Sequence, residues 1–487
     1  MLAELDRLAE ASAALEPRPE QRRIWAELLF NHTDRYIDRL PEARAFSNRR
    51  DAVHDLSIDG GAHSLDELLA VYSEDVEGRG LNPASGGHLG YIPGGGIFTA
   101  SLADYLAAIT NEYAGIYFAS PGAVTIEHEV INWLKRVFGF PESAVGNLPS
   151  GGSIANLIAL TAARDHHGIK NERVRTAVIY LSEQVHHCIY KALRIIGLGD
   201  ATVRFVRLDE LHRMDAGHLR ELISADRAAG LHPFLMIASA GTTDTGAIDP
   251  LDSLADIAAD EGMWMHVDAA YGGFFILLEE QQSKFRGIEK ADSLVVDPHK
   301  GLFLPYGVGA VLVKNREAVL QSQHYIANYM QDAFKEDLPL NPADLSPELT
   351  KHFRGLRVWL PLKMHGIEPF QACLREKILL TAYFRHRLKA LGFELGPEPE
   401  LSVSYFWYPR KTVTDQNDFN RSLLEKIHRD GRVFLSSTML GDRFVIRMAI
   451  LAFRTKKATV DRAVDMVADA LEACRKEYRS SDVSECG

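Results

Sequence analysis

Cysteine is scarce in this chain, and its spacing argues against two classes of protein. The 487 residues include only four cysteines, which are far apart and form no CxxC pair: Cys188, Cys373, Cys474 and Cys486. A disulfide framework or a zinc site has a closer and more regular spacing, whereas scattered reduced thiols are typical of intracellular proteins. We therefore expect neither disulfide bonds nor a metal ion.

Long apolar runs and excess positive charge are also missing. No run of about 18 apolar residues is present to cross a membrane, and the acidic start MLAELD lacks the apolar core of a signal peptide. The 54 Lys and Arg residues are outnumbered by 66 Asp and Glu residues, which gives a formal net charge of −12. Such a charge disfavours nucleic acid or an anionic membrane as a partner. The expectation is a cytoplasmic protein that binds neither.

The chain does contain a long alternation of apolar strands and helices. With 487 residues, of which 46% are hydrophobic, it can form two or three domains around a large core. The pattern predicts an amphipathic helical arm over residues 1–85, a large α/β domain over 86–361 and a smaller α/β domain over 362–487. Repeated strand–helix–strand units favour a mostly parallel sheet with helices on both faces.

Three predicted strands of the large domain end in chemically useful side chains. Residues 293–301 (SLVVDPHKG) form an apolar strand and then a turn that carries Lys300. Residues 264–273 (WMHVDAAYGG) place Asp268 at a strand end, and residues 234–243 run into threonine hydroxyls. A lone lysine after a strand is usually a surface residue. Ligands of open α/β sheets, however, bind at the carboxyl ends of the strands, where these three strands offer an amine, a carboxylate and a hydroxyl.

Pyridoxal phosphate (PLP) needs this combination of groups. Its aldehyde forms a Schiff base with a lysine, and an anion beside its pyridine nitrogen keeps that nitrogen protonated. Residues 148–156 (LPSGGSIAN) offer a seat for the phosphate, because a glycine-rich turn opens a helix with free N–H groups. Gly152 and Ser153 are the best-placed contacts, although an ordinary serine N-cap has the same pattern.

The motifs HVDAAYGG, DPHKG and ASAGTTDTG resemble those of the PLP-dependent decarboxylases of the aromatic-amino-acid and glutamate decarboxylase group, and the resemblance runs from about residue 86 to 454. It implies the PLP-dependent transferase-like α/β fold (fold type I) and a homodimer with active sites at the subunit interface, in which the N-terminal arm wraps the second subunit. It also implies that Lys300 is the Schiff-base lysine, that Asp268 pairs with the pyridine nitrogen, and that His186, rather than His187, stacks on the ring. Further contacts with the cofactor are expected from Thr243, Ala270, Ser293 and His299.

A glycine-rich loop at residues 86–96 (GGHLGYIPGGG) indicates backbone that passes close to another group. A nucleotide site is an alternative, but the loop lacks the lysine of a P-loop. By resemblance the loop lines the substrate pocket through Tyr91, Pro93 and Gly94. The aromatic-amino-acid decarboxylases share the Tyr and the Pro but have Thr in place of Gly94, so we expect a roomier pocket here.

Two residues of the later chain are further candidates. Counted from the lysine, Tyr329 falls on the family's catalytic tyrosine, which protonates Cα of the substrate; an anchoring role in the loop is the alternative, since Tyr325 is close by. Residues 331–351 contain three prolines and no clear period, which predicts a lid or mobile loop. Arg447 lies in an apolar strand and needs an anionic partner, either the substrate carboxylate or a structural salt bridge.

Asp297 departs from the family pattern. The aromatic and glutamate decarboxylases have Asn at this position near the phosphate, and a carboxylate beside a phosphate is unfavourable unless it is protonated or turned away. The aspartate at position 297 therefore weakens the assignment of this chain to any one substrate class of the family.

These observations predict the decarboxylation of an L-amino acid to the amine and CO2, through a Schiff base on Lys300 and a quinonoid carbanion. Tyr91 and Pro93 favour an aromatic substrate. An aldehyde-forming enzyme, a lyase and a decarboxylase of an acidic amino acid are alternatives on the same scaffold. A cofactor-binding protein without catalysis is disfavoured, because the chain contains all four candidate catalytic residues: Lys300, Asp268, His186 and Tyr329.

Overall fold

A seven-stranded sheet forms the centre of the computed structural model, which describes residues 1–58, 60–323 and 338–484. The strands, in chain order, are β3 Val145–Asn147, β4 Ala177–Leu181, β5 Thr202–Phe205, β6 His232–Ser239, β7 Trp264–Asp268, β8 Ser293–Val296 and β9 Ala310–Val313. Their order in the sheet is β3-β9-β8-β7-β6-β4-β5. Neighbours from β8 to β5 are parallel, whereas β9 pairs antiparallel with β8 and β3. The predicted mostly parallel sheet is confirmed.

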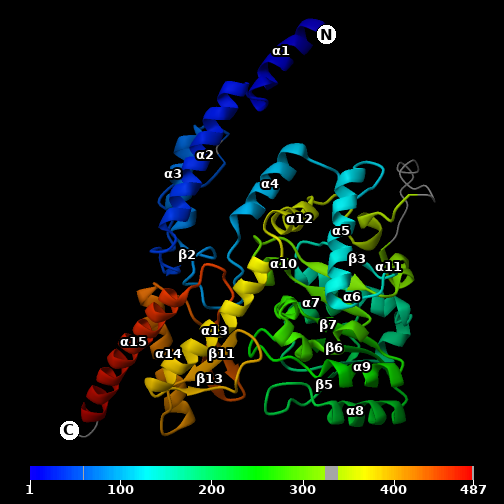
Figure 1. The fold of residues 1–487 in the computed structure, drawn as a ribbon, viewed down its shortest axis with the longest axis vertical. Helices are drawn as coiled ribbons and strands as arrows, with labels where there is room; N and C mark the ends of the chain where they lie inside the picture. Colours follow the sequence, from blue (N-terminus) through cyan, green and yellow to red (C-terminus); the bar gives the residue numbers. More distant parts are fainter. Residues whose placement is uncertain (59, 324–337, 485–487) are drawn as a thin grey trace.

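The residues of these strands suit a sheet that is covered on both faces. Every residue of β4, β8 and β9 is buried, and continuous runs rich in Val, Ile and Leu are typical of such strands. One face is covered by α6 Gly152–His166, α7 Cys188–Ile195 and α11 Arg316–Gln323, and the other by α5 Pro121–Phe138, α8 Ala216–Ala228 and α9 Leu251–Asp260 (Figure 1). The predicted helices on both faces are thus present.

A second, four-stranded antiparallel sheet lies in the C-terminal part of the chain, with strand order β10-β11-β13-β12. Its strands are β10 Glu394–Leu395, β11 Val403–Trp407, β12 Ser436–Leu440 and β13 Arg443–Ala449. The helices that accompany it are α13 Glu368–Ala390, α14 Val413–Asp430 and α15 Lys457–Ser484. Apolar side chains from all three helices and from the sheet form a separate core, which includes Phe384, Phe419, Ile446 and Val467.

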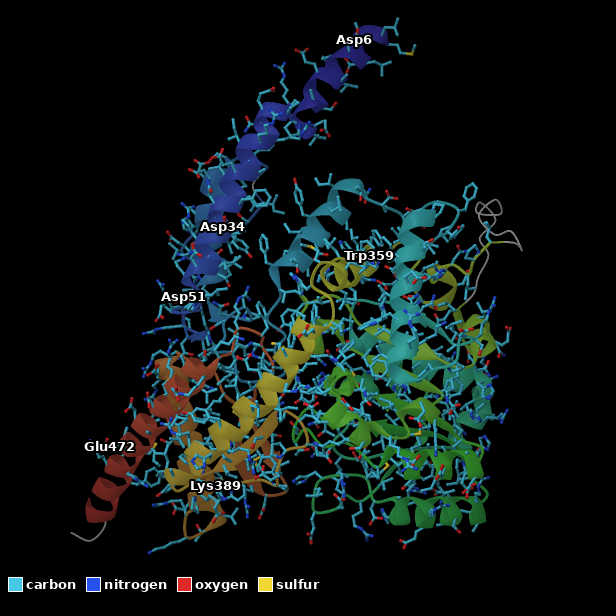
Figure 2. The ribbon with its side chains drawn as sticks, viewed as in Figure 1. Asp6, Asp34, Asp51, Trp359, Lys389 and Glu472 are labelled. Atoms are coloured by element: carbon cyan, nitrogen blue, oxygen red, sulfur yellow. The ribbon has the colours of Figure 1, made fainter. Side chains whose placement is uncertain are left out.

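The N-terminal arm consists of α1 Leu2–Ser12, α2 Pro19–Arg39 and α3 Leu65–Tyr72. Figure 1 shows α1 and α2 projecting away from the body of the molecule. In Figure 2, Asp6 lies near the tip of this arm, far from Trp359 in the body. No residue of α1 is buried, and His32 is the only buried residue of α2. The arm is therefore helical, as predicted, but it has almost no core of its own.

A short antiparallel pair, β1 Phe46–Ser47 and β2 Gly80–Leu81, joins the arm to the body. The backbone N–H of Phe46 donates to the carbonyl of Gly431, at the end of α14, over 3.0 Å.

Among the described residues, no helix is both long and apolar enough to cross a membrane.

The remaining helices of the body are α4 Phe98–Thr110, α10 Pro298–Gly301 and α12 Arg354–His365. The segment 338–351, part of the expected lid, is held against this body. Asn147 donates through Nδ2 to the carbonyl of Pro342 at 2.6 Å, and the buried Lys351 Nζ lies 2.7 Å from Glu127 Oε2. The described part of the loop, 338–351, is thus packed on the body, and the expectation of a lid or mobile loop stays a prediction. Residues 331–337 and Tyr329 lie outside the described residues.

Candidate active site

A cavity of about 440 Å³ opens at the carboxyl ends of β6 and β7 and beside the turn that follows β8. This volume is within the usual range for a small-molecule site. The cavity is lined by most of the predicted cofactor residues: Gly152, Ser153, His186, Thr243, Asp268, Ala270, His299 and Lys300. The side chains that the sequence places at separate strand ends therefore meet at one site, as expected for a parallel sheet.

Lys300 lies on α10, which starts directly after β8. Pro298 is its first residue, a position that suits proline because its fixed φ fits a helix and its missing N–H is not needed there. The Nζ atom of Lys300 lies 3.1 Å from Asp297 Oδ2. Burial acts to lower the pKa of Lys300, but the carboxylates of Asp297 and Asp268 outweigh it and raise this pKa above its ordinary value. The amine is therefore held in its charged form.

Asp268 is the last residue of β7, and both of its oxygens accept hydrogen bonds. The N–H of Ala270 donates to Oδ1 at 3.0 Å, and the side-chain amide of Asn156 donates to Oδ2 at 3.2 Å. The two donors hold the carboxylate in one orientation. Asp268 thus offers a fixed negative charge at the cavity wall.

Two imidazoles line the cavity. The N–H of Cys188 donates to Nδ1 of His186 at 3.3 Å, and Nδ1 of His299 donates to the carbonyl of Val308 at 2.6 Å. Burial lowers the pKa of both histidines, so both rings are uncharged at neutral pH. His187 is exposed and does not line the cavity.

The N-terminus of α6 forms another wall of the cavity. Its first helical hydrogen bond runs from Ala155 to Gly151 at 3.1 Å, so the N–H groups of Gly152 and Ser153 come before the helical ladder. Asp297 packs against this turn: a Cβ at Gly152 would lie 2.8 Å from Asp297 Oδ2. The other oxygen, Oδ1, is buried without a hydrogen-bond partner. A carboxylate therefore stands where the sequence predicts a phosphate seat.

Ser293 does not line the cavity. It is the first residue of β8 and pairs with His266, two residues before the end of β7. At about 3.3 Å per residue, the strand carries Ser293 roughly 10 Å from its own carboxyl end. Its Oγ instead bonds to Nε1 of Trp264 and Nδ1 of His266, each at 2.8 Å. The prediction that Ser293 contacts the cofactor is therefore wrong.

The predicted substrate loop packs on the turn that carries the lysine. A Cβ at Gly94 would clash with the backbone carbonyl of His299, and the N–H of Phe453 donates to the carbonyl of Gly94 at 3.4 Å. Pro93 is buried, whereas Tyr91 is 55% exposed. The expected roomier pocket at Gly94 is wrong, because backbone fills the space that the missing side chain leaves.

Arg447 lies on β13 and is only 2% exposed. Its Nη1 donates to Ser436 Oγ at 3.1 Å and its Nε donates to the carbonyl of Asp244 at 3.2 Å, while Nη2 is buried without a partner. Burial lowers its pKa to about 10. Within the described part of the chain no carboxylate forms an ion pair with it, which disfavours the structural salt bridge. Ser436 Oγ also accepts from the N–H of Tyr91 at 3.4 Å, so two of the four predicted substrate residues, Tyr91 and Arg447, share one neighbour.

Sequence reasoning missed three side chains near Asp268. Asn156 and Cys188 line the cavity, and His266 contacts Asn156 at 2.7 Å. The spacing in the sequence could have indicated two of these residues. Asn156 is four residues after Gly152 and therefore shares its helix face, and His266 alternates with Asp268 along β7.

The side chains present fit pyridoxal phosphate. The cavity brings together a lysine amine for an aldehyde, a carboxylate for a ring nitrogen and a helix N-terminus for a phosphate. These three groups belong to Lys300, Asp268 and α6.

Comparison with known proteins agrees with this site. Residues 88–409 match the model described as the pyridoxal-dependent decarboxylase conserved domain. The chain is 37% identical over 394 residues to the aromatic-L-amino-acid decarboxylase of Bacillus atrophaeus, covering 80% of this chain and 82% of that protein. It is 29% identical over 422 residues to tryptophan decarboxylase 2 of Oryza sativa subsp. japonica, covering 83% and 84%.

Solved structures show the same fold. The Oryza sativa TDC with PLP and tryptamine matches with a TM-score of 0.88 at 23% identity, covering 94% of this chain and 99% of that one. The mouse CSAD structure matches with a TM-score of 0.86 at 25% identity, covering 93% and 99%. The expected fold type is thus confirmed. With its family domain, its relatives and its fold in agreement, the chain belongs to the pyridoxal-dependent decarboxylase family and is a PLP-dependent amino acid decarboxylase.

Proposed function

We propose that this enzyme converts an aromatic L-amino acid to its amine and CO2. The observation that carries the proposal is the meeting of the Lys300 amine and the Asp268 carboxylate at one cavity. The aromatic substrate class is supported by the 37% identity to an aromatic-L-amino-acid decarboxylase. It is also supported by Tyr91 and Pro93 in the loop beside the lysine turn.

Residues from several elements would hold the cofactor. Lys300 would bind its aldehyde carbon, Asp268 would pair with its ring nitrogen, and the N–H groups of Gly152 and Ser153 would bind its phosphate. The flat face of the uncharged His186 would cover the ring. Further contacts would come from Thr243, Ala270 and His299. When bound, pyridoxal phosphate supplies an electron sink for the electron pair that remains at Cα after CO2 leaves.

Two side chains of the protein would control the protons at the ring nitrogen and at Cα of the substrate. Asp268, held in place by two hydrogen-bond donors, would keep the proton on the ring nitrogen. The hydroxyl of Tyr329 would deliver a proton to Cα, which releases the amine. This role rests on the position of Tyr329 in the sequence and on the family resemblance.

Arg447 does not line the cavity, but it would pair with the substrate's carboxylate if the substrate reached its buried guanidinium. A buried N–H without an acceptor is costly, and Nη2 of Arg447 is such a group. The ring of Tyr91, which packs against Phe434 with centroids 5.5 Å apart, would contact the aromatic side chain of the substrate. Pro93 and Gly94 would position this loop against the lysine turn.

An aldehyde-forming reaction is the second candidate. The chain is 29% identical over 382 residues to the phenylacetaldehyde synthase of Arabidopsis thaliana. If O2 rather than a proton reached Cα after CO2 leaves, the amino acid, O2 and water would together give an aldehyde, CO2, ammonia and hydrogen peroxide. The tyrosine at position 329 favours the amine, because it offers a proton at Cα.

A panel of amino acids tests the substrate class and the product together. Purified enzyme with PLP is supplied with Tyr, Trp, Dopa, Glu, Asp or diaminobutyrate, and amine, CO2, aldehyde and peroxide are measured. We expect amine and CO2 from the aromatic substrates, and a shift from amine to aldehyde and peroxide in Tyr329→Phe. The matched control Tyr325→Phe should keep the amine. Activity confined to Glu, Asp or diaminobutyrate would contradict the aromatic assignment, and aldehyde from the unmodified enzyme would favour the second candidate.

Asp297 is expected to weaken cofactor binding. Its carboxylate repels a phosphate at the start of α6 and holds Lys300 charged, whereas only the neutral amine attacks an aldehyde. Asp297→Asn should therefore lower the Kd for PLP about tenfold. Because the pKa of Lys300 should fall, cofactor binding should also extend to lower pH. Absorbance titration of the apoenzyme at several pH values measures both effects. Asp256→Asn, the same charge change on the exposed side of α9, is the control; an unchanged Kd in Asp297→Asn would refute this role.

We also propose a homodimer, because the arm exposes apolar side chains that its own chain does not cover. Leu2, Leu5 and Leu8 recur on one face of α1 and are 73%, 56% and 50% exposed. An isolated helix of this length is marginal in water. A second copy of the chain would cover this face.

Sedimentation velocity tests the dimer. The enzyme should sediment with twice the chain mass of 54.2 kDa. Leu5→Ser with Leu8→Ser should shift it toward the monomer without loss of fold, since α1 contributes no buried residue. Leu379→Ser, at an exposed leucine of α13, is the control. A monomeric enzyme, or a double variant that remains fully dimeric, would contradict the arm's role.

A further inference from the structure

A continuous row of hydrogen bonds runs from Asp268 at the cavity wall, through Asn156, into the buried layer between the sheet and α6. Nε1 of Trp264 and Nδ1 of His266 each lie 2.8 Å from Ser293 Oγ. Nε2 of His266 lies 2.7 Å from Asn156 Oδ1, and Nδ2 of Asn156 lies 3.2 Å from Asp268 Oδ2. Ser293, His266 and Asn156 are fully buried, and Trp264 is 2% exposed.

The fold places these side chains in one line. Trp264, His266 and Asp268 alternate along β7 and therefore point to the same face of the sheet. Ser293 is the register partner of His266 on β8, and Asn156 lies on α6, which covers this face. The surrounding layer is apolar. Polar groups in such a layer are tolerated only when each donor and acceptor is paired.

The chemistry of the two ends fixes the direction of every bond in the row. The indole N–H of Trp264 can only donate, so the hydroxyl hydrogen of Ser293 is free to donate to Nδ1 of His266. The Nε2–H of His266 then donates to the Asn156 carbonyl, and the Asn156 amide donates to the carboxylate of Asp268. The reverse arrangement turns the Asn156 carbonyl toward that carboxylate and leaves the Ser293 hydrogen without an acceptor.

The charge state of His266 agrees with this direction. Burial lowers its pKa to about 4, so the ring is neutral and has one donor and one acceptor. The second hydrogen of the Asn156 amide points to Cys188 Sγ at 3.5 Å, so the row has no spare donor.

We propose that Trp264, Ser293, His266 and Asn156 are positioning residues, which together hold Asp268 as an ionised acceptor aimed at the ring nitrogen of the cofactor. The inference rests on the role proposed above for Asp268. The donors between neighbours of the row run in one direction, from Trp264 to Asp268, so Asp268 Oδ2 accepts from Asn156, and the N–H of Ala270 fixes Oδ1. The other titratable groups that act on Asp268 face it from elsewhere at the cavity: His186, Cys188 and Lys300.

Ser293→Ala tests the row at a residue that does not line the cavity. Without the hydroxyl, His266 can adopt its other tautomer, and the Asn156 amide can turn its carbonyl toward Asp268. We expect the Kd for PLP to rise and kcat to fall, each about tenfold, because a hydrogen bond to a charged group is lost. KM should stay within about twofold, since the residues proposed to bind the substrate are unchanged. The absorption band of the bound cofactor should change with pH over a range in which the unmodified enzyme's band is constant.

A matched control and a second variant complete the test. Thr161→Val removes a buried hydroxyl from the same layer, one that donates only to the carbonyl of Leu157, and it should leave all four readouts unchanged. Asn156→Asp replaces the last donor by an acceptor, and it should weaken cofactor binding more at high pH than at low pH, since two adjacent carboxylates need a shared proton.

The readouts separate this inference from the proposed function. If Ser293→Ala matches the unmodified enzyme in cofactor Kd, absorption band and kcat, the role of the row is overturned, and the reaction with aromatic amino acids stands. If the unmodified enzyme does not act on aromatic amino acids, the proposed substrate class fails. The cofactor titrations of Ser293→Ala and Asn156→Asp then still decide the role of the row.

Discussion

The packing of α6 against the carboxyl ends of β7 and β8 is the constraint on which the active site depends. The start of this helix lies so close to Asp297 that Gly152 has no room for a side chain, and a Cβ at Gly309 would lie 2.8 Å from the same carboxylate. One turn further along α6, Asn156 reaches Asp268. A single helix therefore sets both the proposed phosphate seat and the position of Asp268, the proposed partner of the ring nitrogen, and a shift of the helix would move the two together.

The small sheet fixes the other side of the site through the substrate loop. Arg454 donates through Nη1 to the carbonyl of Gly95 at 2.8 Å, and Ser436 of β12 accepts from both Tyr91 and Arg447. The loop in turn rests on the backbone of the lysine turn at Gly94. The two sheets are thus joined through the segment that carries the proposed substrate residues. A change in the small sheet is expected to reach Lys300 through this loop.

The sequence predicts the parts of the site that local patterns determine. Lys300, Asp268 and Gly152 each stand at the end of a strand or the start of a helix, and a parallel sheet brings such ends together whatever the details of packing. The prediction for Ser293 was wrong because closeness in sequence to the lysine does not mean closeness in space: the length of β8 separates Ser293 from Lys300. The row from Trp264 to Asn156 was missed because it joins two strands and a helix that are far apart in the chain.

Other differences arise from tertiary contacts that no local pattern encodes. At Gly94 the missing side chain is replaced by the backbone of a distant turn rather than by empty space. The segment 338–351 is polar and aperiodic, yet Glu127 and Asn147 hold it through Lys351 and Pro342. In both cases the deciding partner is distant in sequence.

The identity of the lysine that binds the cofactor is the central claim, and mass spectrometry tests it directly. The enzyme with bound PLP is reduced with borohydride and digested, and the peptide that carries the added cofactor mass is sequenced. The account predicts that the mass is on Lys300. Its presence on another lysine, or its absence from a preparation that decarboxylates amino acids, would contradict the account.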